Sequence, residues 1–142
     1  MAATDPPARI EAQLSSIFKL FASDELEEVL GALAADGGEW ATTELATLQR
    51  KSPLSCKVSL RLLAEGAERD SFEAEMRAEY ALASRVVRTH DFVEGVRALL
   101  IDKDNAPDWQ PASPQAVDGA MLDALFAPLE AGAQWTPFPE TA

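Results

Sequence analysis

The sequence offers few side chains of the kinds that carry out catalysis. It contains one histidine, His90, and one cysteine, Cys56, and no H-E-x-x-H, C-x-x-C, P-loop or G-x-S-x-G pattern. Its carboxylates are scattered, without the spacing that is typical of a transition-metal site. We therefore predict no catalytic residue, no metal site and no cofactor. We expect His90 to form a hydrogen bond at a helix entrance and Cys56 to behave as a small buried hydrophobic residue.

A cluster of cations lies in one stretch that contains no acidic residue. Its members are Arg50, Lys51, Lys57 and Arg61. Lys57 and Arg61 are one helical turn apart, and the other two cations precede a predicted helix N-terminus, which attracts anions. This basic cluster predicts a docking surface for an acidic or phosphate-bearing partner. An ordinary solvated face is the alternative.

A second group of candidates follows the helix that the sequence predicts after His90. Asp91 and Glu94 have the spacing of a capping box at its start. Five apolar residues then recur at helical spacing and predict one buried stripe: Phe92, Val93, Val96, Leu99 and Leu100. The stripe ends at 102–105, and Pro107 prevents its continuation. The helix thus ends in a charged, turn-forming tip, and we expect chemistry or contact with a partner at this tip.

Helical spacing of apolar residues accounts for most of the remaining chain. It predicts further helices over about 10–21, 24–36, 42–50, 70–87 and 118–127. Gly37 and Gly38 are placed to end the second of these. In the helix over 70–87 we expect one apolar face and an ion pair between Glu73 and Arg77. The members of this face are Phe72, Met76, Tyr80, Ala83 and Val87.

The segment 52–66 fits two structures. Its apolar residues alternate over 54–62, as in a half-buried strand. Ser52 and Pro53 suit a helix N-cap and first turn, and Gly66 suits a helix end, so the same segment also fits a helix.

Taken together, these patterns predict an all-α fold of six or seven helices. We expect a flexible lead over 1–8, a single helical domain over 9–130 and a flexible tail over 131–142.

Composition excludes several classes of protein. The chain has 142 residues, 47% of them hydrophobic and 25% charged, which fits one globular domain. A net charge of −12 argues against a nucleic-acid partner. No apolar run reaches the roughly 18 residues of a transmembrane helix, so we expect no membrane partner. The lack of a secretory signal and the single cysteine predict a cytoplasmic location.

Three segments also carry a resemblance to a known family. "SPLSCKVSLRLLAEG", "MRAEYALASRVV" and "HDFVEGVRALLIDKDNAPDWQPA" follow one another at 52–66, 76–87 and 90–112. Their order and spacing resemble the C-terminal region of the 3-hydroxyisobutyryl-CoA hydrolase branch of the enoyl-CoA hydratase/isomerase (crotonase) superfamily. The resemblance extends over about 8–127 and favours the helical alternative for 52–66.

The resemblance implies a C-terminal, cap-type helical domain without the N-terminal catalytic core. In complete members that core supplies backbone N–H groups that stabilise the thioester oxyanion during acyl-CoA hydrolysis. We therefore expect this chain to be inactive alone, to cap an acyl-CoA site on a core in cis or in trans, and to form homo-oligomers. Lys103, Asp104 and Trp109 would contact acyl-CoA; the alternatives are a solvated loop lysine at Lys103 and, at Trp109, an aromatic ring that holds the loop to the core. The basic cluster would dock on the core or on CoA phosphates.

A stand-alone helical interaction module without catalytic activity is the alternative. The two differ in surface: a cap separated from its core exposes a large apolar patch and self-associates. A free-standing module is a monomer with a well-covered surface.

Overall fold

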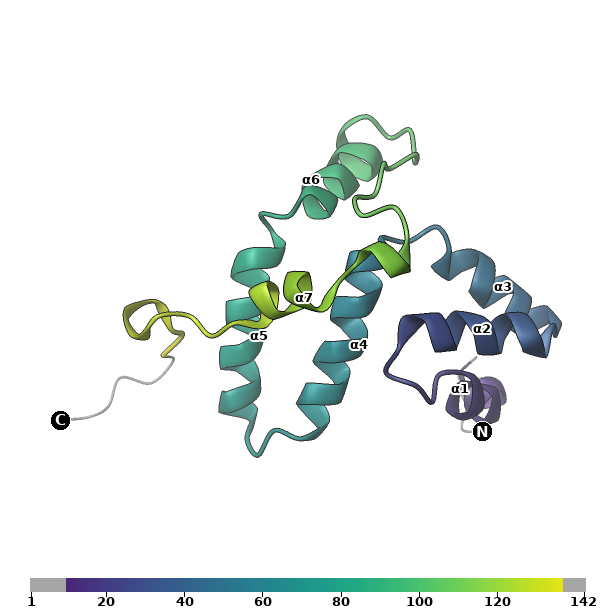
Figure 1. Ribbon diagram of the computed structural model, residues 1–142, viewed down its shortest axis with the longest axis horizontal. Coiled ribbons are helices and arrows are strands. Elements are labelled where there is room, and N and C mark those ends of the chain that lie inside the picture. The colour runs from purple at the N-terminus through teal and green to yellow at the C-terminus, as the bar shows by residue number, and fades with distance from the viewer. Residues whose placement is uncertain (1–9, 137–142) are drawn as a thin grey trace, which may run out of the picture. The chain divides into compact units, whose positions relative to one another are not determined.

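A computed structural model describes residues 10–136, and all regular secondary structure within that range is helical (Figure 1). The elements are α1 (Leu14–Leu20), α2 (Leu26–Asp36), α3 (Glu39–Leu48), α4 (Pro53–Ala67), α5 (Phe72–Val86), α6 (His90–Val96) and α7 (Gly119–Phe126), with the short turns η1 (Glu11–Gln13), η2 (Arg97–Ile101), η3 (Pro114–Ala116) and η4 (Ala131–Ala133). Of these turns η2 is π-helical and the others are 3₁₀. The predicted all-α class is confirmed.

The chain divides into two compact units, 1–48 and 49–142. The prediction of one helical domain over 9–130 stays a prediction. The predicted flexible lead at 1–8 lies outside the described residues, as does the part of the predicted tail at 137–142.

The first unit packs α1, α2 and α3 around a small apolar core. Its buried members are Leu20, Val29, Leu33 and Ala41. The rings of Phe21 and Trp40 lie beside this core with centroids 6.3 Å apart. Gly37 ends α2 in the left-handed conformation, with φ of 66°, as the sequence predicts. Phe18 of α1 is 78% exposed.

In the second unit, α4 and α5 form a helical hairpin, and α7 packs against α5 (Figure 1). The hydroxyl of Ser52 accepts a hydrogen bond from the Ser55 N–H at 3.0 Å, and Pro53 occupies the first turn of α4. This N-cap decides the ambiguity of 52–66 in favour of the helix. Near the hairpin turn, Arg69 pairs with Glu65 at 2.9 Å and with Glu75 at 2.7 Å, which ties α4 to α5.

The buried face of α5 differs from the predicted one. Phe72, Tyr80 and Val87 are exposed, whereas Ala81 and Leu82 are buried. The predicted ion pair of Glu73 and Arg77 is present, at 2.6 Å.

The start of α6 also differs from the predicted one. The N-cap is Thr89, whose hydroxyl accepts a hydrogen bond from the Phe92 N–H at 3.3 Å. Asp91 does not cap the helix, because its carboxylate is buried and binds groups from two other segments.

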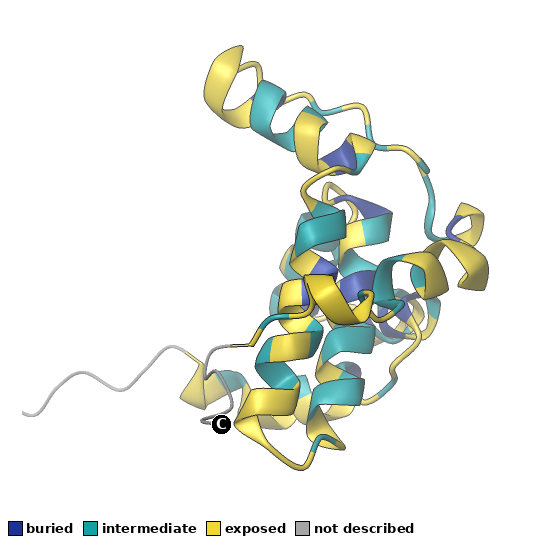
Figure 2. Ribbon diagram, turned by 90° about the vertical axis from the view of Figure 1, so that its left-hand side faces the viewer, coloured by how far each residue is buried: buried dark blue, intermediate teal, exposed yellow. Residues whose placement is uncertain are grey.

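The predicted buried stripe of α6 is wrong. Four members are exposed: Phe92 by 44%, Val93 by 60%, Leu99 by 54% and Leu100 by 68%. Figure 2 shows much of α6 and η2, at the top of the view, in the colour of exposed residues. Within the unit the helix packs instead through Asp91, Gly95 and Ala98, which share one face at helical spacing. The larger apolar side chains are left on other faces of α6 and η2, where no described residue of the unit covers them.

Within 10–136, no helix combines the length and the apolar character needed to cross a membrane.

Candidate functional site

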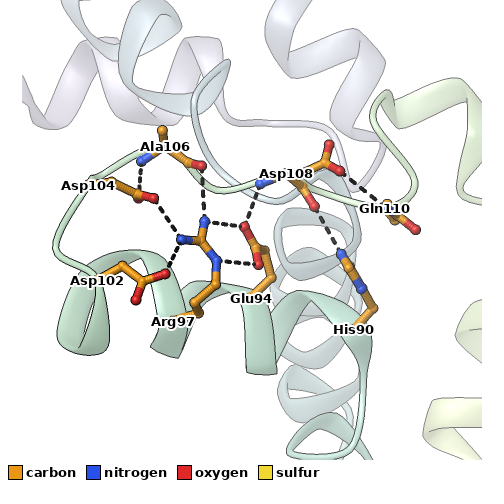
Figure 3. Close-up of polar contacts among 8 residues, drawn as sticks. All are labelled: His90, Glu94, Arg97, Asp102, Asp104, Ala106, Asp108 and Gln110. Carbon is orange, nitrogen blue, oxygen red and sulfur yellow. Dashed lines mark hydrogen bonds and ion pairs between the residues drawn. The ribbon is translucent and has the colours of Figure 1, made fainter.

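The loop that follows η2, residues 102–110, is organised by a single guanidinium (Figure 3). Arg97 Nε and Nη2 donate to the two carboxylate oxygens of Glu94 at 2.9 and 2.7 Å. Its Nη1 donates to Asp102 at 2.7 Å and to Asp104 at 2.6 Å. Its Nη2 also donates to the Ala106 carbonyl at 3.3 Å. All five N–H donors of the side chain are therefore used.

The carboxylates that Arg97 binds also hold the loop backbone. Asp104 accepts a hydrogen bond from the Ala106 N–H at 2.9 Å. Glu94 accepts one from the Asp108 N–H at 2.9 Å, and His90 Nε2 contacts the Asp108 carbonyl at 2.9 Å (Figure 3). His90 thus makes its hydrogen bond at the first residue of α6. The loop is held by side chains of α6 and by its own acidic residues.

These contacts fix the charges of the network. Hydrogen bonds from Arg97 and from the Asp108 N–H lower the pKa of Glu94 from 4.5 to about 2. Arg97 and the Ala106 N–H lower the pKa of Asp104, and hydrogen bonds to Glu94, Asp104 and Asp102 raise the pKa of Arg97. The three groups are therefore all ionised at neutral pH.

Two residues of the loop have left-handed backbone conformations. Lys103 has φ of 56° and Asn105 has φ of 53°. Asparagine tolerates this region, but for lysine it costs about 1–2 kcal/mol, which the surrounding contacts must offset. The Lys103 side chain is exposed and makes no hydrogen bond or ion pair with any residue of 10–136. The loop therefore presents one free ammonium between two carboxylates that Arg97 already holds.

The far end of the loop is attached to the start of α4. The buried carboxylate of Asp91 accepts hydrogen bonds from the Ser52 hydroxyl and, at 2.7 Å, from the Gln110 N–H. Trp109 Nε1 donates to the Arg50 carbonyl at 2.9 Å. The same indole ring lies against Gly95, where an added Cβ would be 3.3 Å from its Cη2 atom. Trp109 thus holds the loop against α6 and against Arg50, which precedes α4.

The structure brings the predicted ligand contacts Lys103, Asp104 and Trp109 into this one loop, with Pro107 between them. Both oxygens of Asp104 are engaged by Arg97 and by the Ala106 N–H.

The four members of the basic cluster have different surroundings. Arg50 and Lys51 are exposed. Lys57 Nζ lies 3.4 Å from the Val117 carbonyl. Arg61 pairs with Glu65 and Asp123, both at 2.7 Å, and its guanidinium lies 4.5 Å from the centroid of the Phe126 ring. Two of the four cations thus contribute to packing inside the unit.

Cys56, which the sequence predicts to be buried, is half-buried, and burial raises the pKa of its thiol.

Sequence reasoning missed Arg97 and the pair of Ser52 and Asp91. Glu94 and Arg97 stand three residues apart on a helix, which was a usable signal for an ion pair. No comparable signal links Ser52 to Asp91, because 39 residues separate them.

The arrangement is suited to binding rather than to bond making. The loop offers an ammonium, a half-buried indole and a rigid backbone. Within the described chain, no three His, Cys, Asp or Glu side chains gather so as to hold a metal ion. A shallow pocket elsewhere in the unit, lined among others by Arg77, Ala81 and Phe126, includes no residue of the loop.

Comparisons with known proteins identify solved structures of similar fold. A carnitinyl-CoA dehydratase from Mycobacterium thermoresistibile superposes with a TM-score of 0.82 at 31% identity, over 90% of this chain and 37% of that one. An enoyl-CoA hydratase from Rhodobacter sphaeroides 2.4.1 gives 0.80 at 32% identity, over 91% of this chain and 38% of that one.

Sequence relatives agree with the structural ones. The mitochondrial 3-hydroxyisobutyryl-CoA hydrolases of Gallus gallus and Homo sapiens are 39% and 37% identical over 120 residues, which are 84% of this chain and 31% of each hydrolase. The chain thus spans about a third of the length of these relatives. Since both are named as mitochondrial, the predicted cytoplasmic location stays a prediction. The sequence profile of the enoyl-CoA hydratase/isomerase family matches residues 1–126. The chain belongs to the enoyl-CoA hydratase/isomerase family.

Proposed function

We propose that this chain is the C-terminal helical part of an acyl-CoA hydrolase of the 3-hydroxyisobutyryl-CoA type, and that it caps a site formed by a catalytic core. The observation that carries the proposal is the apolar face of α6 and η2, where Val93, Leu100 and Ile101 are 60%, 68% and 70% exposed. A contiguous exposed apolar patch usually marks a surface that a protein partner covers. The hydrolase relatives extend well beyond the matched 31% of their length, and the core would be that further part, in cis or in trans.

The division of chemistry follows from what each part contains. Hydrolysis of a thioester needs N–H donors at the developing oxyanion and a carboxylate that handles protons, and these groups belong to the core in our proposal. This chain would contribute binding groups. The Lys103 ammonium suits a CoA phosphate, and Trp109 suits a pocket wall or a stacking surface for the adenine.

In this proposal only two of the four residues of the basic cluster contribute to docking. Arg50 and Lys51 are exposed, so these two cations are the ones that would meet acidic groups of the core or CoA phosphates. Lys57 and Arg61 instead stabilise the second unit. Lys57 contacts the Val117 carbonyl, and Arg61 pairs with Glu65 and Asp123.

The test is reconstitution with a core. The chain alone is titrated calorimetrically with CoA and with a short 3-hydroxyacyl-CoA, and it is assayed for thioester hydrolysis. Both are repeated after mixing with the part of the human hydrolase that the chain does not match. We expect neither binding nor turnover from the chain alone, and turnover from the mixture above that of the core alone. Hydrolysis by the chain alone would contradict the proposal.

A matched pair of variants assigns the docking face in the same experiment. Leu100→Glu places a charge on the face of α6 and η2, and Phe72→Glu places one on α5, at a side chain that is 79% exposed. We expect only Leu100→Glu to abolish the gain in turnover. Equal effects of the two variants would remove the face of α6 and η2 from the proposal.

A stand-alone interaction module remains the second candidate, because the same apolar face would also suit a non-catalytic partner. In that case the mixture would show no turnover beyond that of the core, with or without the variants.

A further inference from the structure

The loop after η2 raises a specific problem for anion binding. Besides Lys103 it contains Asp102, Asp104 and Asp108, and Glu94 lies beside it. A lone ammonium among four carboxylates would ordinarily pair with its neighbours and would be a poor site for a phosphate. The loop can present a usable positive charge only if those neighbours are held elsewhere.

Arg97 meets this requirement for three of the four carboxylates, and the fourth, Asp108, accepts a hydrogen bond from Gln110 Nε2 at 3.3 Å. Arg97 binds Asp102 and Asp104, the two residues that flank Lys103, through one nitrogen, Nη1, at 2.7 and 2.6 Å. It binds Glu94 through two parallel hydrogen bonds. The flanking carboxylates are thereby paired with the guanidinium, and the Lys103 side chain keeps no partner among the described residues.

The same guanidinium supports the strained backbone. Lys103 and Asn105 both have left-handed backbone conformations. Two hydrogen bonds hold the backbone around them, and Arg97 supports one of these through Asp104. Asp104, held by Arg97, accepts the Ala106 N–H at 2.9 Å, and the Asn105 N–H donates to the Ala98 carbonyl at 3.1 Å. Strained conformations of this kind persist where the surroundings over-determine them, and they cluster at functional sites.

We propose that Arg97 is the positioning residue of this loop: it binds the carboxylates on either side of Lys103 and fixes the backbone, so that the Lys103 ammonium stays available to an anionic group of the ligand. The identification of that anion as a CoA phosphate rests on the proposed function, whereas the role of Arg97 does not. Lysine could not replace Arg97, because an ammonium has three donors and cannot bind Glu94 in parallel while holding two aspartates.

The experiment measures the loop in the full chain without any ligand. Arg97→Met is compared with Arg97→Lys and with Arg77→Met, a matched control that breaks only the surface ion pair with Glu73. Amide hydrogen exchange reports the backbone at Asn105, Ala106 and Asp108. Labelling by an amine-reactive acetylating reagent, read by mass spectrometry, reports Lys103, with the exposed Lys51 as internal reference.

We expect exchange of the three loop amides to rise at least about tenfold in Arg97→Met, less in Arg97→Lys and not at all in Arg77→Met. Labelling of Lys103 should fall about threefold in Arg97→Met, because the released aspartates then pair with the Lys103 side chain. Adding Asp102→Asn and Asp104→Asn to Arg97→Met should restore labelling while exchange stays fast.

Two results would overturn the inference. Unchanged loop exchange in Arg97→Met would show that the guanidinium does not fix the backbone. Unchanged or increased labelling of Lys103 would show that Arg97 does not keep the carboxylates from it, and this readout separates positioning from a merely structural role. A failure of the proposed function would appear elsewhere, as a Lys103→Ala variant with unaltered KM for the thioester in the reconstituted mixture.

Discussion

Asp91 is a carboxylate that the fold buries, and it connects three segments. It is 2% exposed and accepts hydrogen bonds from the Ser52 hydroxyl and the Gln110 N–H. The start of α4, the start of α6 and the end of the loop therefore meet at one side chain. A buried carboxylate is tolerated only when donors replace the water that it has lost.

Asp91→Ala should accordingly be among the more destabilising single substitutions in the second unit. It leaves the Ser52 hydroxyl and the Gln110 N–H without their acceptor, a penalty of about 1–3 kcal/mol. We expect the free energy of unfolding, measured by urea denaturation and circular dichroism, to fall by about 2 kcal/mol. Asp70→Ala, at an exposed position, is the matched control and should change it by less than about 0.5 kcal/mol. Equal stabilities of the two variants would argue against a role for the buried carboxylate.

At this scale the sequence predicts residue types better than residue partners. The sequence predicts Asp91 as the N-cap of α6, whereas the structure uses Thr89 and pairs the Asp91 carboxylate with Ser52, 39 residues away. The pairing of Glu94 with Arg97 follows from helical spacing. The contacts of Arg97 with Asp102 and Asp104 do not, because they require the left-handed turn at Lys103.

At the scale of the element, the loop 102–108 should lose its order in acid. Contacts with Arg97 and the Asp108 N–H lower the pKa of Glu94 from 4.5 to about 2, and contacts with Arg97 and the Ala106 N–H lower that of Asp104. Since the folded loop favours the ionised carboxylates, their contribution to its stability is complete above about pH 4.5 and is lost as the pH falls towards about 2.

Hydrogen exchange of the Ala106 and Asp108 amides across this pH window measures the effect, after correction for the intrinsic dependence of exchange on pH. Protection should decrease steadily in the native chain below about pH 4.5. In Glu94→Gln the pH dependence should be weaker, because one of the two carboxylates whose pKa the loop lowers is then absent. A native chain whose protection is constant down to pH of about 2 would contradict the ion network as the source of loop order.

The packing of α6 against the loop makes a second prediction at this scale. Alanine in place of glycine usually stabilises a helix interior by about 0.5–1 kcal/mol. At Gly95 the new Cβ would lie 3.3 Å from Trp109 Cη2, which is a tight contact, so we expect no such gain and a changed near-ultraviolet dichroism from a displaced indole. Gly31 in α2 has no atom within 4 Å of the added Cβ, and Gly31→Ala should show the gain. If Gly95→Ala raised the free energy of unfolding as much as Gly31→Ala does, the Trp109 indole would be shown to move aside without an energetic cost.

The sequence predicts which segments are helical, and it predicts less well which way they face. The cap at Ser52 and Pro53 and the glycine at Gly37 are local signals, and both act as expected. The stripe of α6 fails because periodicity identifies an apolar face without saying what covers it. In η2, Ala98 is buried and Leu100 is 68% exposed, although both are apolar.

At the scale of the whole molecule, the net charge opposes self-association and the exposed apolar surface favours it. The net charge of −12 makes copies of the chain repel one another at low ionic strength. The exposed side chains of α6 and η2 favour association, since burying apolar surface contributes about 25 cal/mol per Å². The balance between the two should depend on salt, which screens the repulsion and leaves the apolar attraction intact.

We therefore expect the isolated chain to associate into at least a dimer at high concentration, more strongly at about 300 mM salt than at about 20 mM. Sedimentation velocity measures the dissociation constant. Leu100→Glu should weaken association at least about tenfold, because it adds a charge to a face that must become desolvated. Phe72→Glu adds the same charge at a side chain 79% exposed on α5 and should weaken association only through the added repulsion, which high salt removes. If the chain stayed monomeric at both salt concentrations, the apolar face of α6 and η2 would be stable while exposed to water. That outcome would favour the stand-alone module over the cap.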